Sequence, residues 1–331
     1  MFLDFYKLRE QPFGVTPDPR FLYLSPVHRE ALASMFYGID AGRGFLALIA
    51  KPGMGKTTLL FQLLQQLRPT ARTAFLFQTQ CNSREFMRFL LLELGCELTG
   101  EQDLVTMHEM FNRCLLQEAR AERRFILVVD EAQNLDASVL ETVRLLSDFE
   151  TPQAKLVQIV LSGQPELADK LARPALRQLR QRISLLSTLA PLSPLEVERY
   201  INHRLRTAGR VDPLFTASAV NMIAELSEGI PRNINNICFN ALSLACSLRH
   251  KTVEVDVVRQ VAADFDLASL RSEPGFPSGL AHGAFEARPI DTGQTSIPVE
   301  TRSPELLKPE DAVAYFRNVS QRLKNNEHFA D

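Results

Sequence analysis

The chain has 331 residues, enough for two domains, and its 45% hydrophobic and 23% charged residues are typical of a globular protein. A total of 37 basic and 39 acidic residues leaves a net charge of −2, so no overall electrostatic attraction draws it to nucleic acid or to membranes. The 5 cysteines form no C-x-x-C pair and the 6 histidines show no metal-ligand spacing, which argues against a disulfide framework and a zinc site.

The N-terminus carries charges among its apolar residues, unlike a signal peptide. No apolar run reaches the about 18 residues that a membrane-spanning helix needs. We therefore expect a cytoplasmic protein without direct membrane insertion, which reaches the inner membrane only through a partner.

Residues 1–43 are rich in aromatic residues and proline and end in a predicted helix over residues 26–39. From residue 45 onward, apolar runs alternate with segments of helical periodicity. The apolar runs lie at 45–49, 74–77, 125–129, 156–161 and 183–189, and the helical segments at 56–67, 84–94, 104–120, 137–149 and 165–181. This alternation predicts an α/β domain over residues 1–190, with a parallel sheet covered by helices on both faces.

After Pro191 the pattern is entirely helical and predicts a small all-α domain over residues 191–268. Ser193, Pro194 and Glu196 form a helix-start signature, and Gly209 ends that helix. Further helices are predicted over residues 217–228, 231–249 and 254–265. Residues 269–303 are rich in proline, glycine and serine and predict a disordered linker, and residues 304–331 contain a short amphipathic helix.

The first chemical motif lies between the first apolar run and the helix that follows it. The segment reads AKPGMGKTT from Ala50 and matches the phosphate-binding loop G-x-x-x-x-G-K-[ST], except that Ala50 replaces the first glycine. We expect Ala50 to fit if its φ angle is negative. The lysine would reach the β- and γ-phosphates of ATP, and the helix N-terminus would favour the same anion. The residues expected to bind ATP are Pro52, Gly53, Met54, Gly55, Lys56, Thr57 and Thr58.

A second motif, Asp130-Glu131, ends the buried apolar run FILVV, which places two carboxylates at the carboxyl end of a predicted central strand. We expect Asp130 and Thr57 to hold Mg²⁺, and Glu131 to activate the attacking water. The two motifs together predict ATP hydrolysis and argue against a non-hydrolysing nucleotide switch.

Three further positions complete the predicted catalytic set. The apolar run 156–161 is followed by polar residues that could contact the γ-phosphate or the water, and we favour Gln164 because of its reach, with Ser162 as the alternative. Arg177, Arg180 and Arg182 precede the last apolar run, and one of them could act on the nucleotide of a neighbouring subunit. Arg232 lies at a helix start, where the helix dipole disfavours a cation, so a role at the nucleotide is plausible.

These motifs in this order resemble the AAA+ ATPases, and most of all the general secretion pathway protein A family. The stretches that carry the resemblance are PFGVTPDPRFLYLSPVHREAL, PGMGKTTL, LVVDEAQNL, IVLSGQPELADKL, LRQLRQRI, APLSPLEVERYINHRLRTAG and GIPRNINNIC, which span residues 1–268.

The resemblance implies a P-loop NTPase core with a five-stranded parallel sheet, a small all-α lid and ATP bound between them. It also implies a homo-oligomeric ring or filament. Lys56 and Thr57 would belong to the Walker A loop, and Asp130 and Glu131 to Walker B. Gln164 or Ser162 would be sensor 1, Arg232 sensor 2 and Arg182 the arginine finger.

We therefore expect an ATPase that serves a bacterial secretion, pilus or exopolysaccharide-export apparatus through a membrane or export protein. The larger members of the family continue into a transmembrane segment and a peptidoglycan-binding domain, which the resemblance does not extend to here. The alternative is a DNA-bound, transposition-type regulator. In that case Arg120, Arg123, Arg124 and the basic residues of 173–182 would contact phosphates.

Overall fold

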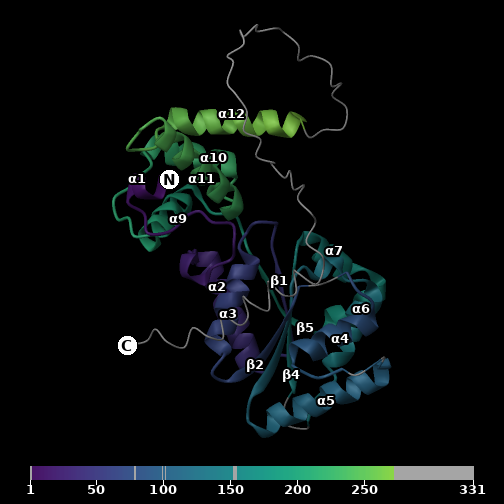
Figure 1. Ribbon diagram of the computed structural model, residues 1–331. Coiled ribbons are helices and arrows are strands. Elements are labelled where there is room, and N and C mark those ends of the chain that lie inside the picture. The colour runs from purple at the N-terminus through teal and green to yellow at the C-terminus, as the bar shows by residue number, and fades with distance from the viewer. Residues whose placement is uncertain (1, 78–79, 99, 101, 152–154, 272–331) are drawn as a thin grey trace, which may run out of the picture. The chain divides into compact units, whose positions relative to one another are not determined.

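The computed structural model describes residues 2–77, 80–98, 100, 102–151 and 155–271 (Figure 1). The predicted C-terminal helix, and the predicted linker beyond residue 271, lie outside these residues. Among the described helices, none combines the length and the apolar character needed to cross a bilayer.

The centre of the fold is a five-stranded parallel sheet, which confirms the predicted fold class. Its strands are β1 (Phe45–Ile49), β2 (Ala71–Leu76), β3 (Arg124–Val129), β4 (Val157–Gly163) and β5 (Ile183–Thr188). The strand order is β2-β3-β4-β1-β5, and every neighbouring pair is parallel. Strands β1 and β4 are buried along their whole length, as expected for strands covered on both faces.

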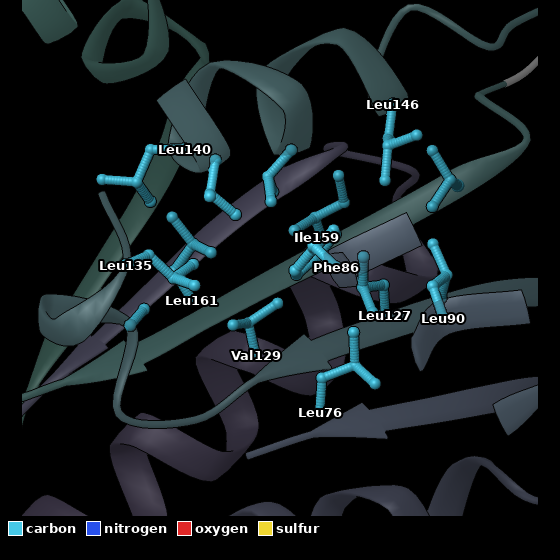
Figure 2. Close-up of a cluster of buried hydrophobic side chains, with 14 of the residues drawn as sticks. Leu76, Phe86, Leu90, Leu127, Val129, Leu135, Leu140, Leu146, Ile159 and Leu161 are labelled. Atoms are coloured by element: carbon cyan, nitrogen blue, oxygen red, sulfur yellow. The ribbon is translucent and has the colours of Figure 1, made fainter. Parts of the chain in front are cut away.

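Helices cover both faces of this sheet (Figure 1). One face packs against α2 (Pro26–Asp40) and α3 (Lys56–Leu67), and the other against α4 (Ser83–Glu93), α5 (Leu104–Arg120) and α6 (Ala137–Leu146). Side chains of one strand alternate between the faces. Val128 therefore lies in the first apolar cluster, which faces α2 and α3, and Leu127 in the second, which faces α4, α5 and α6. Figure 2 shows the second cluster, in which Leu76, Val129 and Leu161 meet Phe86 and Leu140.

The single helix predicted over 165–181 is broken in the structure. It consists of α7 (Pro165–Ala172), a 3-10 turn η3 (Pro174–Leu176) and α8 (Arg177–Arg182). The break occurs at Pro174, which lacks an N–H and drives the preceding Arg173 to an extended conformation with φ −64° and ψ 143°.

The lid comprises α9 (Pro194–Thr207), α10 (Ala217–Ser227), α11 (Pro231–Ser247) and α12 (Val255–Arg271). Helix α12 thus runs past the predicted end at residue 265 and includes residues 269–271, which the sequence assigns to the linker. The capping box predicted for α9 is present, because Ser193 N donates to Glu196 Oε2 over 2.8 Å.

Residues 2–21 pack with the lid rather than with the sheet, although the sequence analysis places them in the first domain. Helix α1 (Phe2–Tyr6) contributes Tyr6 to the apolar cluster of the lid, the 3-10 turn η1 (Pro19–Phe21) contributes Phe21, and the segment between them contributes Phe13. Tyr6 also donates a hydrogen bond of 2.9 Å to the carbonyl of His250. Residues 2–21 contain only two short helical elements, so their aromatic side chains become buried by packing against the lid.

Candidate active site

The strand order brings three polar segments to one edge of the sheet. Strand β4 lies between β3 and β1, so the segments that follow these three strands are neighbours in space. They are the loop from Ala50, the Asp130-Glu131 pair, and Gln164 at the start of α7. Ligands of open α/β sheets bind at this edge, and a pocket here is lined by Pro52–Thr58, Glu131 and Gln164.

The loop before α3 has a backbone shaped by its glycines. Gly53 and Gly55 have φ angles of 78° and 85°, in the left-handed region that glycine tolerates. Ala50 is absent from the residues with positive φ, so its side chain fits the first position of the loop, as expected. Gly55 caps α3 without any side-chain hydrogen bond, which leaves the first N–H groups of that helix for a ligand.

Helix α2 contacts this loop through His28, which is 3% exposed. Its Nε2 lies 3.1 Å from the carbonyl oxygen of Met54, and its Nδ1 lies 2.8 Å from Ser25 Oγ. Since the carbonyl only accepts, the ring donates from Nε2 and accepts from the serine hydroxyl at Nδ1. Burial lowers the pKa of His28, which favours this neutral form.

Lys56 is a buried cation that faces the pocket. Its side chain is 5% exposed, and Nζ donates to the carbonyl of Ala50 over 3.0 Å. Within the described part of the chain, Lys56 forms no ion pair. Burial lowers its pKa, while the charges of Glu131 and Asp130 act in the opposite direction. A buried ammonium without a carboxylate partner fits an anionic ligand such as a phosphate.

Asp130 and Thr57 place two oxygen atoms side by side. Thr57 Oγ1 donates to Asp130 Oδ2 over 2.6 Å, and Ser162 Oγ donates to Asp130 Oδ1 over 2.8 Å. Ser162 is fully buried and thus holds Asp130 in place rather than lining the pocket. A hydroxyl next to a carboxylate supplies the hard oxygen ligands that Mg²⁺ prefers, so the residues present fit this ion.

Glu131 has a left-handed backbone conformation with φ 52° and begins the 3-10 turn η2 (Ala132–Asn134). Its Oε2 accepts hydrogen bonds from Gln133 Nε2 over 2.6 Å and from Gln164 Nε2 over 3.0 Å. Burial raises the pKa of Glu131, but the two amide hydrogen bonds and the charges of Lys56 and Arg232 outweigh it, and the net pKa is lowered. The carboxylate is therefore ionised at neutral pH.

Arg232 lies at the start of α11 and lines the same pocket. Its backbone N–H donates to the carbonyl of Gly53 over 3.1 Å, which joins the lid to the loop. A methyl group on Gly53 would lie 2.7 Å from Arg232 Cβ, so this approach requires glycine. The guanidinium is exposed and its charge acts on both Lys56 and Glu131.

The far end of the pocket contains residues that the sequence analysis missed. Arg204, 8% exposed, donates to Tyr200 Oη over 2.9 Å and lies 4.9 Å from the ring centre of Phe21. Tyr200 donates to Asn235 Oδ1 over 2.8 Å, and Asn235 reaches the carbonyl of Gly14 over 3.4 Å. The sequence does contain a signal for Arg204, because it falls on the apolar stripe of α9, and a charged side chain is rarely buried there unless it has a partner.

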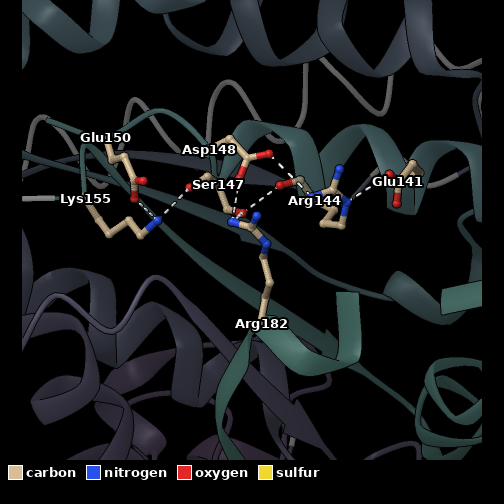
Figure 3. Close-up of polar contacts among 7 residues, drawn as sticks. All are labelled: Glu141, Arg144, Ser147, Asp148, Glu150, Lys155 and Arg182. Atoms are coloured by element: carbon tan, nitrogen blue, oxygen red, sulfur yellow. Dashed lines mark hydrogen bonds and ion pairs between the residues drawn. The ribbon is translucent and has the colours of Figure 1, made fainter. Parts of the chain in front are cut away.

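Arg182 lies at the opposite edge of the sheet. It directly precedes Ile183, which pairs with Phe45 at the start of β1, whereas the loop follows the end of this 5-residue strand. At about 3.3 Å per residue, the 5 residues of β1 place about 16 Å between the amino and carboxyl ends of the strands. Figure 3 shows Arg182 directed at Ser147 and Asp148, with an ion pair of 2.5 Å to Asp148 Oδ1. The structure thus does not bring Arg182 to the pocket of its own chain.

The basic residues considered for DNA contact are in part engaged with carboxylates. Arg123 pairs with Glu118 over 2.6 Å, and Arg124 pairs with Asp40 over 2.7 Å. Both pairs are near the surface, and both reduce the positive charge offered to a phosphate backbone.

Comparison with known proteins agrees with this geometry. Residues 39–171 match the family model of an AAA domain. The chain is 39% identical over 294 residues to general secretion pathway protein A of Aeromonas hydrophila, an alignment that covers 88% of this chain and 53% of that protein. The chain therefore spans about half the length of this curated relative.

Solved structures share the fold. The ORC2 protein of Aeropyrum pernix, solved in ADPNP–ADP complexes, aligns at 15% identity with a TM-score of 0.60, over 77% of this chain and 71% of that one. Drosophila ORC bound to DNA aligns at 19% identity with a TM-score of 0.59, over 79% of this chain and 67% of that one. At these identities the likeness concerns the fold alone. The chain thus carries an AAA domain with a P-loop NTPase fold, and over 88% of its length it is a relative of general secretion pathway protein A.

Proposed function

We propose that this chain binds ATP with Mg²⁺ and hydrolyses it to ADP and phosphate. The observation that carries the proposal is the convergence of Lys56, Thr57 and Glu131 on one pocket at the carboxyl ends of three strands, with Asp130 hydrogen-bonded to Thr57. A phosphate-binding cation, oxygen ligands for a metal and an ionised carboxylate are the parts that phosphoryl transfer to water requires.

Each group has a distinct role in this proposal. The free N–H groups of the loop and of α3 surround the phosphates, and Lys56 neutralises their outer charge. Thr57 and Asp130 would hold Mg²⁺, which would neutralise the phosphate oxygens when bound. Glu131 accepts the proton of the attacking water, Gln164 orients that carboxylate, and Arg232 supplies a cation from the lid.

Two substitutions test the proposal. Glu131→Gln should retain ATP binding and lower turnover on the order of a hundredfold or more. Lys56→Ala should weaken ATP binding. Asp136→Asn serves as the control, because it removes an exposed carboxylate from the same loop without touching the pocket. Unchanged turnover in Glu131→Gln would remove this residue from the role of base.

We propose further that the active form is a homo-oligomer in which Arg182 acts on the nucleotide of a neighbouring copy. Its distance from its own pocket, and its exposed ion pair with Asp148, support this role, because such surface pairs contribute only about 0–1 kcal/mol and break easily. An Arg182→Ala chain and a Lys56→Ala chain, each inactive alone, should recover part of the ATPase activity when mixed. Activity of Arg182→Ala chains on their own would contradict the proposal.

The name of the curated relative supports a role in secretion, so we propose that the ATPase serves an envelope secretion or export apparatus from the cytoplasmic side. The partner would be a membrane or export protein, and residues 304–331 are the candidate recruiting segment. Affinity capture with the full chain and with a chain lacking 304–331 tests this. ATPase activity that rises strongly with duplex DNA at both low and moderate salt would instead favour the DNA-bound regulator.

A further inference from the structure

Glu131 does not lie free in the pocket, because Gln133 and Gln164 form a hydrogen-bonded ring with its carboxylate. Gln133 donates from Nε2 to Glu131 Oε2 over 2.6 Å, and its Oε1 accepts the backbone N–H of Gln164 over 3.1 Å. Gln164 closes the ring with its own donation to Oε2 over 3.0 Å. Both amides thus hold the same oxygen, and among the residues that the structure describes Glu131 Oε1 accepts no hydrogen bond.

The orientation of the Gln133 amide is unambiguous. A backbone N–H only donates and a carboxylate only accepts, so the amide oxygen must face Gln164 N and the amide nitrogen must face Glu131. A side chain at this position must therefore combine a donor and an acceptor at its tip. Met would have no donor and only a weak acceptor, and Glu would place a second negative charge beside Glu131.

The surroundings of Gln133 are built to fit this amide. A methyl group on Gly163 would lie 2.8 Å from Gln133 Oε1, so the absence of a side chain there makes room for it. Lys170 Nζ donates to the carbonyls of Gln133 and Leu135 over 2.6 and 2.8 Å, which fixes the η2 backbone against α7. The turn η2, strand β4 and helix α7 together determine the position of the Gln133 amide.

We infer that Gln133 is a positioning residue that holds the Glu131 carboxylate by Oε2, so that Oε1 faces the pocket as the acceptor for the attacking water. The inference rests on the function proposed above and extends it to a residue outside the loop and Walker B motifs. It assigns to Gln133 an effect on the turnover step and not on ATP binding, since Gln133 does not line the pocket.

The test is the steady-state ATPase kinetics of the full chain with Gln133→Met. We expect kcat to fall about tenfold to hundredfold, the range for losing a hydrogen bond to a charged group, with KM and ATP affinity close to wild type. Gln133→Glu keeps the acceptor for Gln164 N but places a second negative charge beside Glu131, so its kcat should fall as well.

The control is Asn134→Ala, which alters an exposed side chain of the same turn. It should leave kcat and KM unchanged. A wild-type kcat in either Gln133 variant overturns the inference, and so does a higher kcat, which would make Gln133 a restraint. If the wild-type chain itself does not turn over ATP, the proposed function fails, which is a different result from wild-type kinetics in Gln133→Met.

Discussion

Replacing Gly229 by Ala should force the backbone at Gly229, between α10 and α11, away from Leu192, between β5 and α9. Gly229 has φ +68°, and a methyl group there would lie 2.1 Å from the carbonyl oxygen of Leu192 and 2.9 Å from its nitrogen. Carbon–oxygen contacts are about 3.3–3.6 Å, so the two backbones must move apart by about 1 Å. That movement also breaks the hydrogen bond of 2.9 Å from Leu192 N to the carbonyl of Gly229.

The expected loss of stability is about 2.5 to 6.5 kcal/mol. The left-handed conformation costs an alanine about 1–2 kcal/mol, the lost hydrogen bond about 0.5–1.5 kcal/mol, and the backbone displacement about 1–3 kcal/mol. Gly95→Ala separates these contributions, because Gly95 has a similar φ of +77° and nothing within 4 Å of the added methyl group. Only the conformational cost of about 1–2 kcal/mol applies there.

Urea unfolding of both variants, followed by circular dichroism, measures the difference directly. The affinity for a fluorescent ATP analogue should fall in Gly229→Ala as well, since Arg232 N–H, three residues further on, bonds to Gly53. If Gly229→Ala unfolds within about 0.5 kcal/mol of Gly95→Ala, the close contact with Leu192 does not constrain the protein and the reasoning is wrong.

Three further predictions concern Thr57 in the loop and two sites at the helices that cover the sheet. Thr57→Val removes the donor to Asp130 Oδ2 and one Mg²⁺ ligand, so Mg²⁺-dependent turnover should fall at least about tenfold while stability without nucleotide changes by about 1 kcal/mol. The lowered pKa of His28 means that the unfolded chain binds the proton first, so stability should fall as pH drops below about 6.5, by up to about 1.4 kcal/mol per pH unit, and His28→Asn should flatten that slope. Cys96 and Cys114, with sulfurs 3.4 Å apart, should form a disulfide with oxidised glutathione, slowly at neutral pH because burial raises the pKa of Cys96 to about 11, and mass spectrometry should find this pair joined.

Local patterns predicted the fold because each strand is a short apolar run next to a helix-period segment. The loop at Lys56 and the pair at Asp130 were visible for the same reason, since each motif lies within a few residues of a strand end. The break at Pro174 was also readable from the sequence, because proline and its predecessor both resist helix. Helical periodicity alone was the wrong guide there.

Contacts between distant segments were not predictable in the same way. Gln133 meets Gln164 only because β4 lies beside β3, and the strand order is not written in any local pattern. Arg204 joins the pocket through the fold of the lid around residues near Pro12 and Phe21. The preference for Gln164 over Ser162 as the polar residue at the pocket was based on reach, and in the structure Ser162 is fully buried beside Asp130.

The packing of the N-terminal residues on the lid gives that body two covalent tethers instead of one. One tether runs through residues 22–24, between η1 and α2, and the other through residues 189–193, between β5 and α9. Because the lid is attached at these two points, its easiest movement is a rotation about the line that joins them. Leu22, Tyr23 and Leu192, which belong to the two tethers, all line the pocket. A molecule bound there would touch both pivots of that rotation at once.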